Sequence, residues 1–307
     1  MTTITLPEPL RAAIAKNPEW AGLDVAVDPV FGGITNENFR LRIGDSQPIF
    51  AKVPGLGTEK FINRDTANQA ARQAAAAGIS PQVLFYDASS GIEFSEFVAD
   101  GFRTATTLDF QRADVCRGVM DTYRRWHGTP LLSETKTMVD MVEEHLAQVE
   151  EDGIPLPDWS ADVLRNYREA VDAFMVSGLE LVPAHNDPMP GNFLIDDAAN
   201  VTLIDFDYAA NNEASFEIGL ILTEMFVDID RSRELVAEYR GEHDERFFAR
   251  AMLSRMIADT KWGLWGLINA HARDEDFDYF KYGSWKLYRT FWISRRPEYR
   301  QWLDAAR

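Results

Sequence analysis

The chain has 307 residues, of which 46% are hydrophobic and 12% aromatic, a composition that excludes a disordered protein and predicts one large or two medium globular domains. Its formal net charge of −18 argues against nucleic-acid binding through a general basic surface, because such a chain repels phosphate backbones. A cationic partner fits this charge better, although acidity could also serve only to keep the protein in solution.

Cysteine content and apolar runs narrow the class further. Cys116 is the only cysteine, which excludes an internal disulfide and a cysteine-rich metal site. The first residues, MTTITLPEPLRAAIAK, contain no long apolar run with a cleavage site, and no later stretch is suited to span a bilayer. We therefore expect a cytoplasmic protein of enzyme size with no membrane partner.

The first hundred residues predict a small lobe of mixed structure. NFRLRI, residues 38–43, alternates apolar and charged side chains as a half-buried strand does, and PIFAKV, residues 48–53, predicts a second strand. The Ala-rich segment 61–78 predicts a helix that ends at its glycine. Residues 82–98 predict two strands joined by a Ser-Ser-Gly turn.

After Gly101 the pattern becomes mostly helical. Apolar residues recur at three- and four-residue spacing in four segments: 108–127, 137–150, 160–177 and 214–227. A hairpin-like stretch, FLIDDAANVTLIDF, interrupts these helices. The sequence thus predicts an α+β chain, with a β-rich lobe over 1–98, a hinge at about 96–103 and a helical lobe over 104–307.

Acids and amides gather in the stretch HNDPMPGNFLIDDAANVTLIDF. Asp187 and Asn192 are five apart on a predicted loop, and Asp205 lies at the end of the following strand. A kinase needs one carboxylate to accept the substrate hydroxyl proton, and an amide and a second carboxylate to hold magnesium. Any one of these residues alone could be a helix cap or a turn residue. Together, and preceded by a lysine in a predicted strand, they favour phosphoryl transfer.

Two motifs, HNDPMPGNFLI and LIDFDYAANNEASFEIG, resemble the choline and ethanolamine kinases of the aminoglycoside phosphotransferase and protein-kinase-like superfamily. The resemblance runs from about Phe31 to Tyr282 and implies a two-lobed kinase-like fold. It implies that Asp187 is the catalytic base, and that Asn192 and Asp205 bind Mg²⁺. His185 would be structural and would support the loop.

The nucleotide site implied by this resemblance lies in the small lobe. FGGITNENF precedes the first strand, where a kinase has its phosphate-covering loop, although its glycine pair could simply make a turn. Gly33, Thr35 and Asn36, with the backbone around them, would donate hydrogen bonds to phosphate oxygens. Lys52 stands where kinases have the strand lysine that pairs with the α- and β-phosphates. The alternative for Lys52 is a solvent-facing lysine on an edge strand.

Two more features of the small lobe bear on the nucleotide. EFSEFVADG resembles the kinase hinge, so backbone groups between Glu96 and Val98 would contact the adenine of ATP. Relatives carry a glutamate in the small-lobe helix, three residues after an arginine like Arg64, that pairs with the strand lysine. Here Ala67 occupies that position, which leaves the partner of Lys52 open.

The acceptor site is expected in the C-terminal part. Trp262 and Trp265 are three apart on one helical face, and Phe277 and Tyr282 follow. Spacing alone favours a core stripe, but the segment resembles the W-G-L-W helix of choline kinases, in which tryptophans and later aromatics surround a quaternary ammonium group. The resemblance adds two residues that would contact the substrate: Tyr208 and Glu224.

The function predicted from these residues is ATP-dependent phosphorylation of the hydroxyl of a small cationic alcohol, most of all choline. The alternatives are ethanolamine or another amino alcohol, an aminoglycoside, or a catalytically weak nucleotide-binding protein, which the missing glutamate suggests. Self-association into a homodimer is left open.

Overall fold

In the computed structural model, the chain is described over residues 6–31, 36–55, 57–58, 61–98, 101–273 and 277–307. It divides into two compact units, each described here by itself. Unit 1 comprises Met1–Asp109 and Met189–Ala209, and unit 2 comprises Phe110–Pro188 and Ala210–Arg307. The segment Met189–Ala209 therefore packs with unit 1, although it follows more than half of the chain. The single boundary expected near residues 96–103 stays a prediction.

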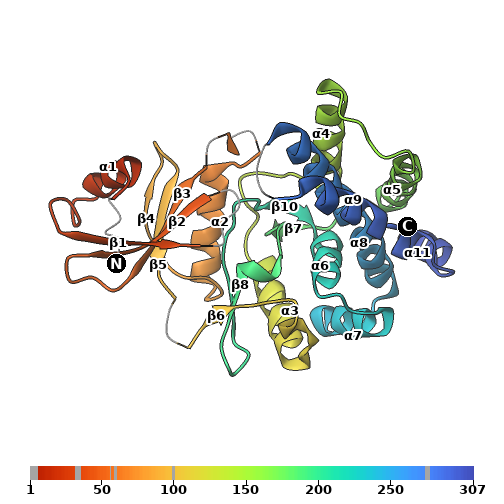
Figure 1. Cartoon of the computed structure of the whole chain (residues 1–307). Helices are drawn as coiled ribbons and strands as arrows, with labels where there is room; N and C mark the ends of the chain where they lie inside the picture. The colour runs from red at the N-terminus through yellow and green to blue at the C-terminus, as the bar shows by residue number, and fades with distance from the viewer. Residues whose placement is uncertain (1–5, 32–35, 56, 59–60, 99–100, 274–276) are drawn as a thin grey trace. The chain divides into compact units, whose positions relative to one another are not determined.

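Unit 1 is built on a five-stranded antiparallel sheet with strand order β1-β2-β3-β5-β4 (Figure 1). The strands are β1 (Val25–Val30), β2 (Asn36–Ile43), β3 (Ile49–Pro54), β4 (Val83–Asp87) and β5 (Ile92–Glu96), and the helices α1 (Glu8–Lys16) and α2 (Arg64–Ala76). Alternation in β2 buries Phe39, Leu41 and Ile43 in one core with Leu10 and Phe94. Because β3 lies between β2 and β5, it is not an edge strand, and the alternative interpretation of Lys52 is wrong.

A second sheet in unit 1 has the order β6-β8-β9 and contains the predicted hairpin. Its strands are β6 (Arg103–Thr104), β8 (Phe193–Ile195) and β9 (Val201–Leu203). The register pairs Phe193 with Leu203. The Leu203 N–H donates to the Ile79 carbonyl at 2.8 Å, which ties the hairpin to the chain that follows α2.

Unit 2 consists of helices around α8 and one small sheet of β7 (Leu181–Ala184) and β10 (Ala210–Glu213). The helices are α3 (Ala113–His127), α4 (Met138–Glu151), α5 (Ser160–Met175), α6 (Ala214–Glu224), α7 (Ile229–Arg240), α8 (Glu245–Ala272), α9 (Tyr279–Arg289), α10 (Phe291–Ser294) and α11 (Tyr299–Ala305). Helix α8 packs against α4, α6, α9 and α11, and most of its residues are buried (Figure 1). A helix surrounded by other helices must be apolar on nearly all sides, as α8 is.

The structure confirms the predicted fold class, α+β with a β-rich part and a mostly helical part. The predicted strands, the hairpin and the helices over 61–78, 108–127, 137–150, 160–177 and 214–227 are all present, with ends that differ by a few residues. Within the described ranges, no helix is both long enough and apolar enough to cross a bilayer.

Candidate active site

Lys52 lies at the centre of an ion-pair network in unit 1. Its Nζ is 2.6 Å from Oδ1 of Asp207 and 3.2 Å from Oδ1 of Asp205. The other oxygen of Asp207 accepts hydrogen bonds from Arg64 Nη1 at 3.1 Å and from Asn36 Nδ2 at 2.7 Å. Asp207 is therefore bound by two cations and one amide, and its side chain is only 4% exposed.

Electrostatics keeps both partners of this pair ionised. Burial alone would raise the pKa of Asp207, but attraction to Lys52 and Arg64 outweighs it and lowers that pKa to about 2. Burial alone would lower the pKa of Lys52, but Asp207 and Asp205 reverse the direction and raise it. Ala67 stands where relatives have the glutamate that pairs with this lysine. Lys52 is held instead by Asp205 and Asp207, which follow β9.

The hairpin brings the two predicted metal ligands to one end of unit 1. Asn192 lies just before β8, and Asp205 lies just after β9. The Ile204 N–H donates to the Asn192 carbonyl at 3.0 Å, directly beyond the Phe193–Leu203 pair, so the two residues lie at the same open end of the hairpin. Asp205 has a φ of +66°, a conformation that non-glycine residues adopt at a cost. One carboxylate and one amide oxygen, completed by phosphate oxygens and water, form a donor set that suits Mg²⁺. The residues therefore fit the ion that the prediction requires.

The loop that carries Asp187 is held inside unit 2 by a buried carboxylate on α6. Glu217, with no exposed surface, accepts the N–H of His185 at 3.0 Å and the N–H of Asn186 at 2.6 Å. Its Oε2 also lies 2.8 Å from His127 Nε2. Carboxylates that accept backbone N–H groups in a dry interior make short, charge-assisted bonds, which fix the loop before Asp187.

Further contacts complete the support of this loop. The Asp187 N–H donates to His185 Nδ1 at 3.2 Å, and His185 is fully buried. Asn212 Nδ2 donates to Asn186 Oδ1 at 2.9 Å, which supports a residue with a φ of +65°. Asp187 is itself half-buried, at the surface of this polar cluster. The supporting role predicted for His185 agrees with these contacts.

The predicted aromatic residues of α8, of α9 and of the chain just before α9 come together in unit 2. The ring of Trp265 meets the rings of Trp262 at 5.7 Å, Tyr282 at 5.9 Å and Tyr279 at 5.7 Å between centroids, all edge to face. Phe277 adds contacts to Tyr279 and Tyr282 at 4.8 and 5.9 Å. We call these five residues the aromatic cluster. The sequence prediction lacked only Tyr279.

Close helix packing makes this cluster possible. A Cβ added to Gly266 would lie 2.6 Å from the Cα of Gly283, and one added to Gly263 would lie 2.6 Å from the side chain of Leu287. Helices α8 and α9 therefore approach each other through glycine backbone, and the rings next to these glycines meet.

Three cations of the chain already contact the residues expected to hold the substrate. The Nζ of Lys261 lies 3.0 Å from the centroid of the Trp262 ring. Glu224 accepts from Lys286 Nζ at 2.6 Å and lies 3.4 Å from Arg289 Nη2. We call Glu224, Asp259, Lys286 and Arg289 the Glu224 cluster; in it two carboxylates face two cations. Burial would raise the pKa of Glu224, but Lys286 and Arg289 lower it, so it stays ionised.

The remaining predicted residues lie as follows. Gly33 and Thr35 fall outside the described residues, and Asn36 binds Asp207. Glu96 ends β5 and is exposed, and Val98 follows it half-buried. Tyr208 belongs to unit 1, whereas Glu224 and the aromatic cluster belong to unit 2.

Comparison with known proteins agrees with this geometry. The model of the choline/ethanolamine kinase family matches residues 27–243. The chain belongs to the choline/ethanolamine kinase family. The probable choline kinase 3 of Arabidopsis thaliana is 24% identical over 95% of this chain and 94% of its own length.

Solved structures of the choline/ethanolamine kinase family share the fold. A family protein from Mesorhizobium loti is 27% identical, with a TM-score of 0.84 and coverage of 99% of both chains. LicA in complex with AMP is 18% identical, with a TM-score of 0.71, and covers 93% of this chain and 94% of its own. The fold is the kinase-like one that aminoglycoside phosphotransferases also have, so the predicted family and fold are confirmed.

Besides Tyr279, sequence reasoning missed three functional candidates in this family member: Asp207, Glu217 and Lys261. Asp207 and Glu217 stand inside the motif LIDFDYAANNEASFEIG, and an acid such as Glu217 amid the apolar residues of a predicted helix is a signal that was available. Lys261 directly precedes W-G-L-W, but the sequence does not show whether the side chain of this lysine points toward the predicted cation site or away from it.

Proposed function

We propose that this protein transfers the γ-phosphoryl group of ATP to the hydroxyl of a small amino alcohol, with choline as the first candidate acceptor. The observation that carries the proposal is the Asp187 loop. It is fixed by Glu217 within the same unit as the aromatic cluster. A positioned carboxylate close to an apolar, ring-lined site is what deprotonation of a small alcohol requires.

In this proposal, the groups of unit 1 serve the phosphates. Lys52, oriented by Asp207, pairs with the nucleotide phosphates, and Asn192 and Asp205 hold Mg²⁺, which supplies charge neutralisation when bound. Asp187 accepts the proton of the acceptor hydroxyl as the oxygen attacks the γ-phosphorus, and the bond from that phosphorus to the bridging oxygen breaks to release ADP. The contact of backbone groups between Glu96 and Val98 with adenine stays a prediction, as do the cytoplasmic location and the homodimer.

The acceptor rests on the aromatic cluster. Trp265 and Tyr282 supply ring faces, and a trimethylammonium head over such faces gains about 0.5–2 kcal/mol per contact. Family membership covers both choline and ethanolamine kinases, so ethanolamine is the second candidate. The specific observation in its favour is that Lys261 covers the Trp262 ring, because a trimethylammonium head cannot donate hydrogen bonds and depends on such ring faces more than a primary ammonium does.

The test is a coupled ADP-release assay with ATP, Mg²⁺ and a panel of choline, ethanolamine, other amino alcohols and aminoglycosides. We expect choline to have the highest kcat/KM. Asp187→Asn should lower kcat by about 10²-fold or more with the KM for ATP nearly unchanged, because it removes the base alone. Near-normal turnover in folded Asp187→Asn protein would refute the role of Asp187. No turnover with any alcohol would leave the weak nucleotide-binding alternative.

A further inference from the structure

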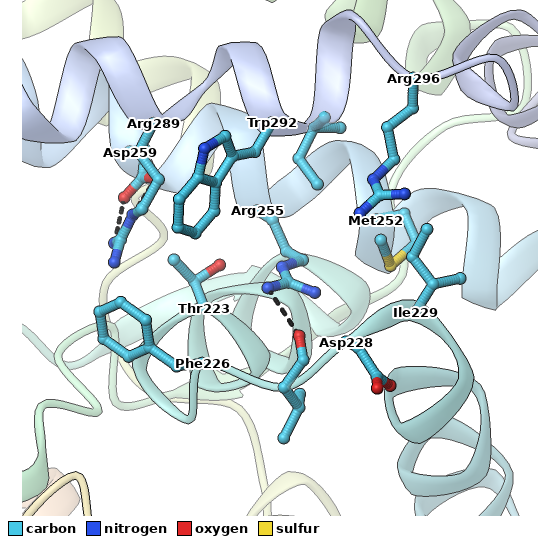
Figure 2. A pocket seen from close by; sticks show the side chains of 12 residues that line it. Thr223, Phe226, Asp228, Ile229, Met252, Arg255, Asp259, Arg289, Trp292 and Arg296 are labelled. Carbon is cyan, nitrogen blue, oxygen red and sulfur yellow. Dashed lines mark hydrogen bonds and ion pairs between the residues drawn. The ribbon is translucent and has the colours of Figure 1, made fainter.

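A pocket in unit 2 lies apart from Asp187 and from the aromatic cluster. It has a volume of about 200 Å³ and lies between the end of α6, the start of α7 and the helices α8, α9 and α10 (Figure 2). The residues that matter for its chemistry are Phe226, Arg255, Asp259, Arg289, Trp292 and Arg296. Three arginines therefore line this small pocket, and the proposed function gives the pocket no role.

Arg255 is the central cation of this pocket (Figure 2). Its guanidinium donates to the Val227 carbonyl and to Ser232 Oγ, each at 3.1 Å, and both acceptors are neutral. Within the described ranges, no carboxylate lies within ion-pair distance of Arg255. Burial lowers the pKa of Arg255 to about 10, with Asp259 and Asp228 opposing the shift and Arg289 and Arg296 adding to it. Its charge is thus only partly compensated by the protein.

Of the two carboxylates that line the pocket, Asp259 is paired with an arginine and Asp228 caps α7. Asp259 binds Arg289 through both oxygens, each at 2.6 Å, and Asp228 accepts the Arg231 N–H at the start of α7 at 2.8 Å. Arg296, exposed just after α10, forms no ion pair with any residue that the structure describes. Arg255 and Arg296 are therefore the cations that remain for a ligand.

Apolar rings lie beside these cations. Trp292 is 52% exposed and Phe226 47% exposed, although both border a concave surface. Phe226 directly follows the last residues of α6 and has a φ of +53°, a left-handed conformation that favours glycine. Its ring lies 5.2 Å from the guanidinium carbon of Arg289.

We propose that this pocket binds a small organic oxyanion, with its phosphate or carboxylate group between Arg255 and Arg296 and its apolar body against Trp292. Planar guanidinium groups match the geometry of both kinds of oxyanion, and an indole face suits a flat apolar body. The volume limits the ligand to the size of one substituted ring.

Binding should also affect the acceptor side, an effect that rests on the proposed function. Asp259 and Arg289 belong to the pocket wall and to the Glu224 cluster, and Thr223 in the wall directly precedes Glu224. An anion held by Arg255 repels Asp259, whose charge acts on Arg255, and so weakens the pairing of Asp259 with Arg289. The expected result is a changed KM for the acceptor with an unchanged KM for ATP.

The site is tested by calorimetric titration of the whole chain with phenyl phosphate, in the presence of a saturating non-hydrolysable ATP analogue that fills the nucleotide site. We expect saturable binding with a Kd of about 1 mM or tighter. Arg296→Ala and Trp292→Ala should each weaken it about tenfold, a loss of about 1.4 kcal/mol. The matched control is Arg295→Ala, which removes a neighbouring exposed charge that does not line the pocket and should leave Kd unchanged.

Benzoate and benzyl alcohol distinguish the parts of the ligand. Benzoate should bind at the same site if the shared oxyanion is recognised, and benzyl alcohol should not bind. Absence of saturable binding, equal affinity in all three variants, or equal affinity for benzyl alcohol would overturn the site. Binding without any change in the acceptor KM would overturn the coupling alone. If no alcohol is phosphorylated, the proposed function fails, while the calorimetry still decides the pocket.

Discussion

The ammonium group of Lys261 lies 3.0 Å from the centre of the Trp262 ring, on a residue expected to hold the cationic head of the substrate. Lys261 is buried on α8, and Asp187 lies close enough to influence its pKa. The chain therefore places one of its own cations on the aromatic cluster and within reach of the charge of the proposed base. A cation that enters this site meets a like charge, which is unfavourable in a dry interior.

Replacing this lysine should improve the binding of choline. Lys261→Met keeps an unbranched apolar stem and removes the charge, so the Trp262 face becomes available to the trimethylammonium group. We expect the KM for choline to fall about threefold to tenfold, or about 0.7–1.4 kcal/mol, with the KM for ATP unchanged. Steady-state kinetics measures both constants.

The control for this variant is Lys281→Met, which removes an exposed lysine of α9 that has no contact with Trp262 in the structure. It should leave both KM values as they are. A KM for choline that rises in Lys261→Met would show that Lys261 assists the acceptor and does not compete with it.

The same lysine predicts how stability depends on pH. Burial lowers the pKa of Lys261 from its ordinary 10.5 to about 7, against the attraction of Asp187 and Glu144 and with the repulsion of Lys136 and Lys286. Between these two pH values, the unfolded chain binds more protons than the folded chain, so the free energy of unfolding rises with pH. Protonation of Lys261 thus opposes folding most strongly below pH 7.

Urea unfolding of the wild type and of Lys261→Met at pH 7 and pH 10 measures this effect. The wild type should gain stability relative to the variant as the pH rises, and the variant should be the more stable protein at pH 7. Parallel behaviour of the two proteins over this range would mean that the pKa of Lys261 is ordinary in the folded state.

Asp207 should matter for ATP binding although it is not one of the predicted metal ligands. Asp207→Asn removes a carboxylate that holds Lys52 and Arg64, both of which are largely buried. Leaving buried charges without their partner costs about 3 kcal/mol of stability. Because Lys52 then loses its orientation, we also expect the KM for ATP to rise and kcat to fall.

Asp197→Asn is the matched control, because it removes an exposed aspartate from the turn of the same hairpin. It should change neither stability nor kinetics. If Asp207→Asn binds ATP as well as the wild type, Lys52 is positioned without Asp207, by its ion pair with Asp205.

Glu217 should act on turnover through the Asp187 loop. Its two oxygens accept the N–H groups of His185 and Asn186, so Glu217→Gln turns one acceptor into a donor that faces another donor. The loop must shift, and a displacement of about 1 Å can cost about 10² in rate. We expect kcat to fall by about that factor with the KM for ATP little changed.

Hydrogen exchange of the 185–187 loop should distinguish Glu217→Gln from Asp187→Asn. Glu217→Gln should expose the amides of the 185–187 loop to hydrogen exchange, whereas Asp187→Asn should leave them protected. Equal protection in the two variants, together with full activity of Glu217→Gln, would show that other contacts fix the loop.

The sequence by itself determined the elements and the local motifs. Alternation in 38–43 and helical spacing in 108–127 depend on neighbouring residues, so the strands and helices they predict are present. The positions of Asn192 and Asp205 follow from one hairpin, and those of Trp262 and Trp265 from one helix turn. Such relationships are set within about fifteen residues, where backbone geometry is regular.

Tertiary structure alone decided the partners of these residues. Lys52 and Asp207 are 155 residues apart, and the sequence showed only that the expected glutamate was missing at Ala67. Other relationships also depend on how segments distant in sequence pack. They are the contact of Glu217 with two backbone N–H groups, the position of Lys261 over Trp262, and the arginines that line the pocket. A charged side chain reaches several neighbours, and burial decides which of them it must bind, because an ion without a partner in a dry interior is costly.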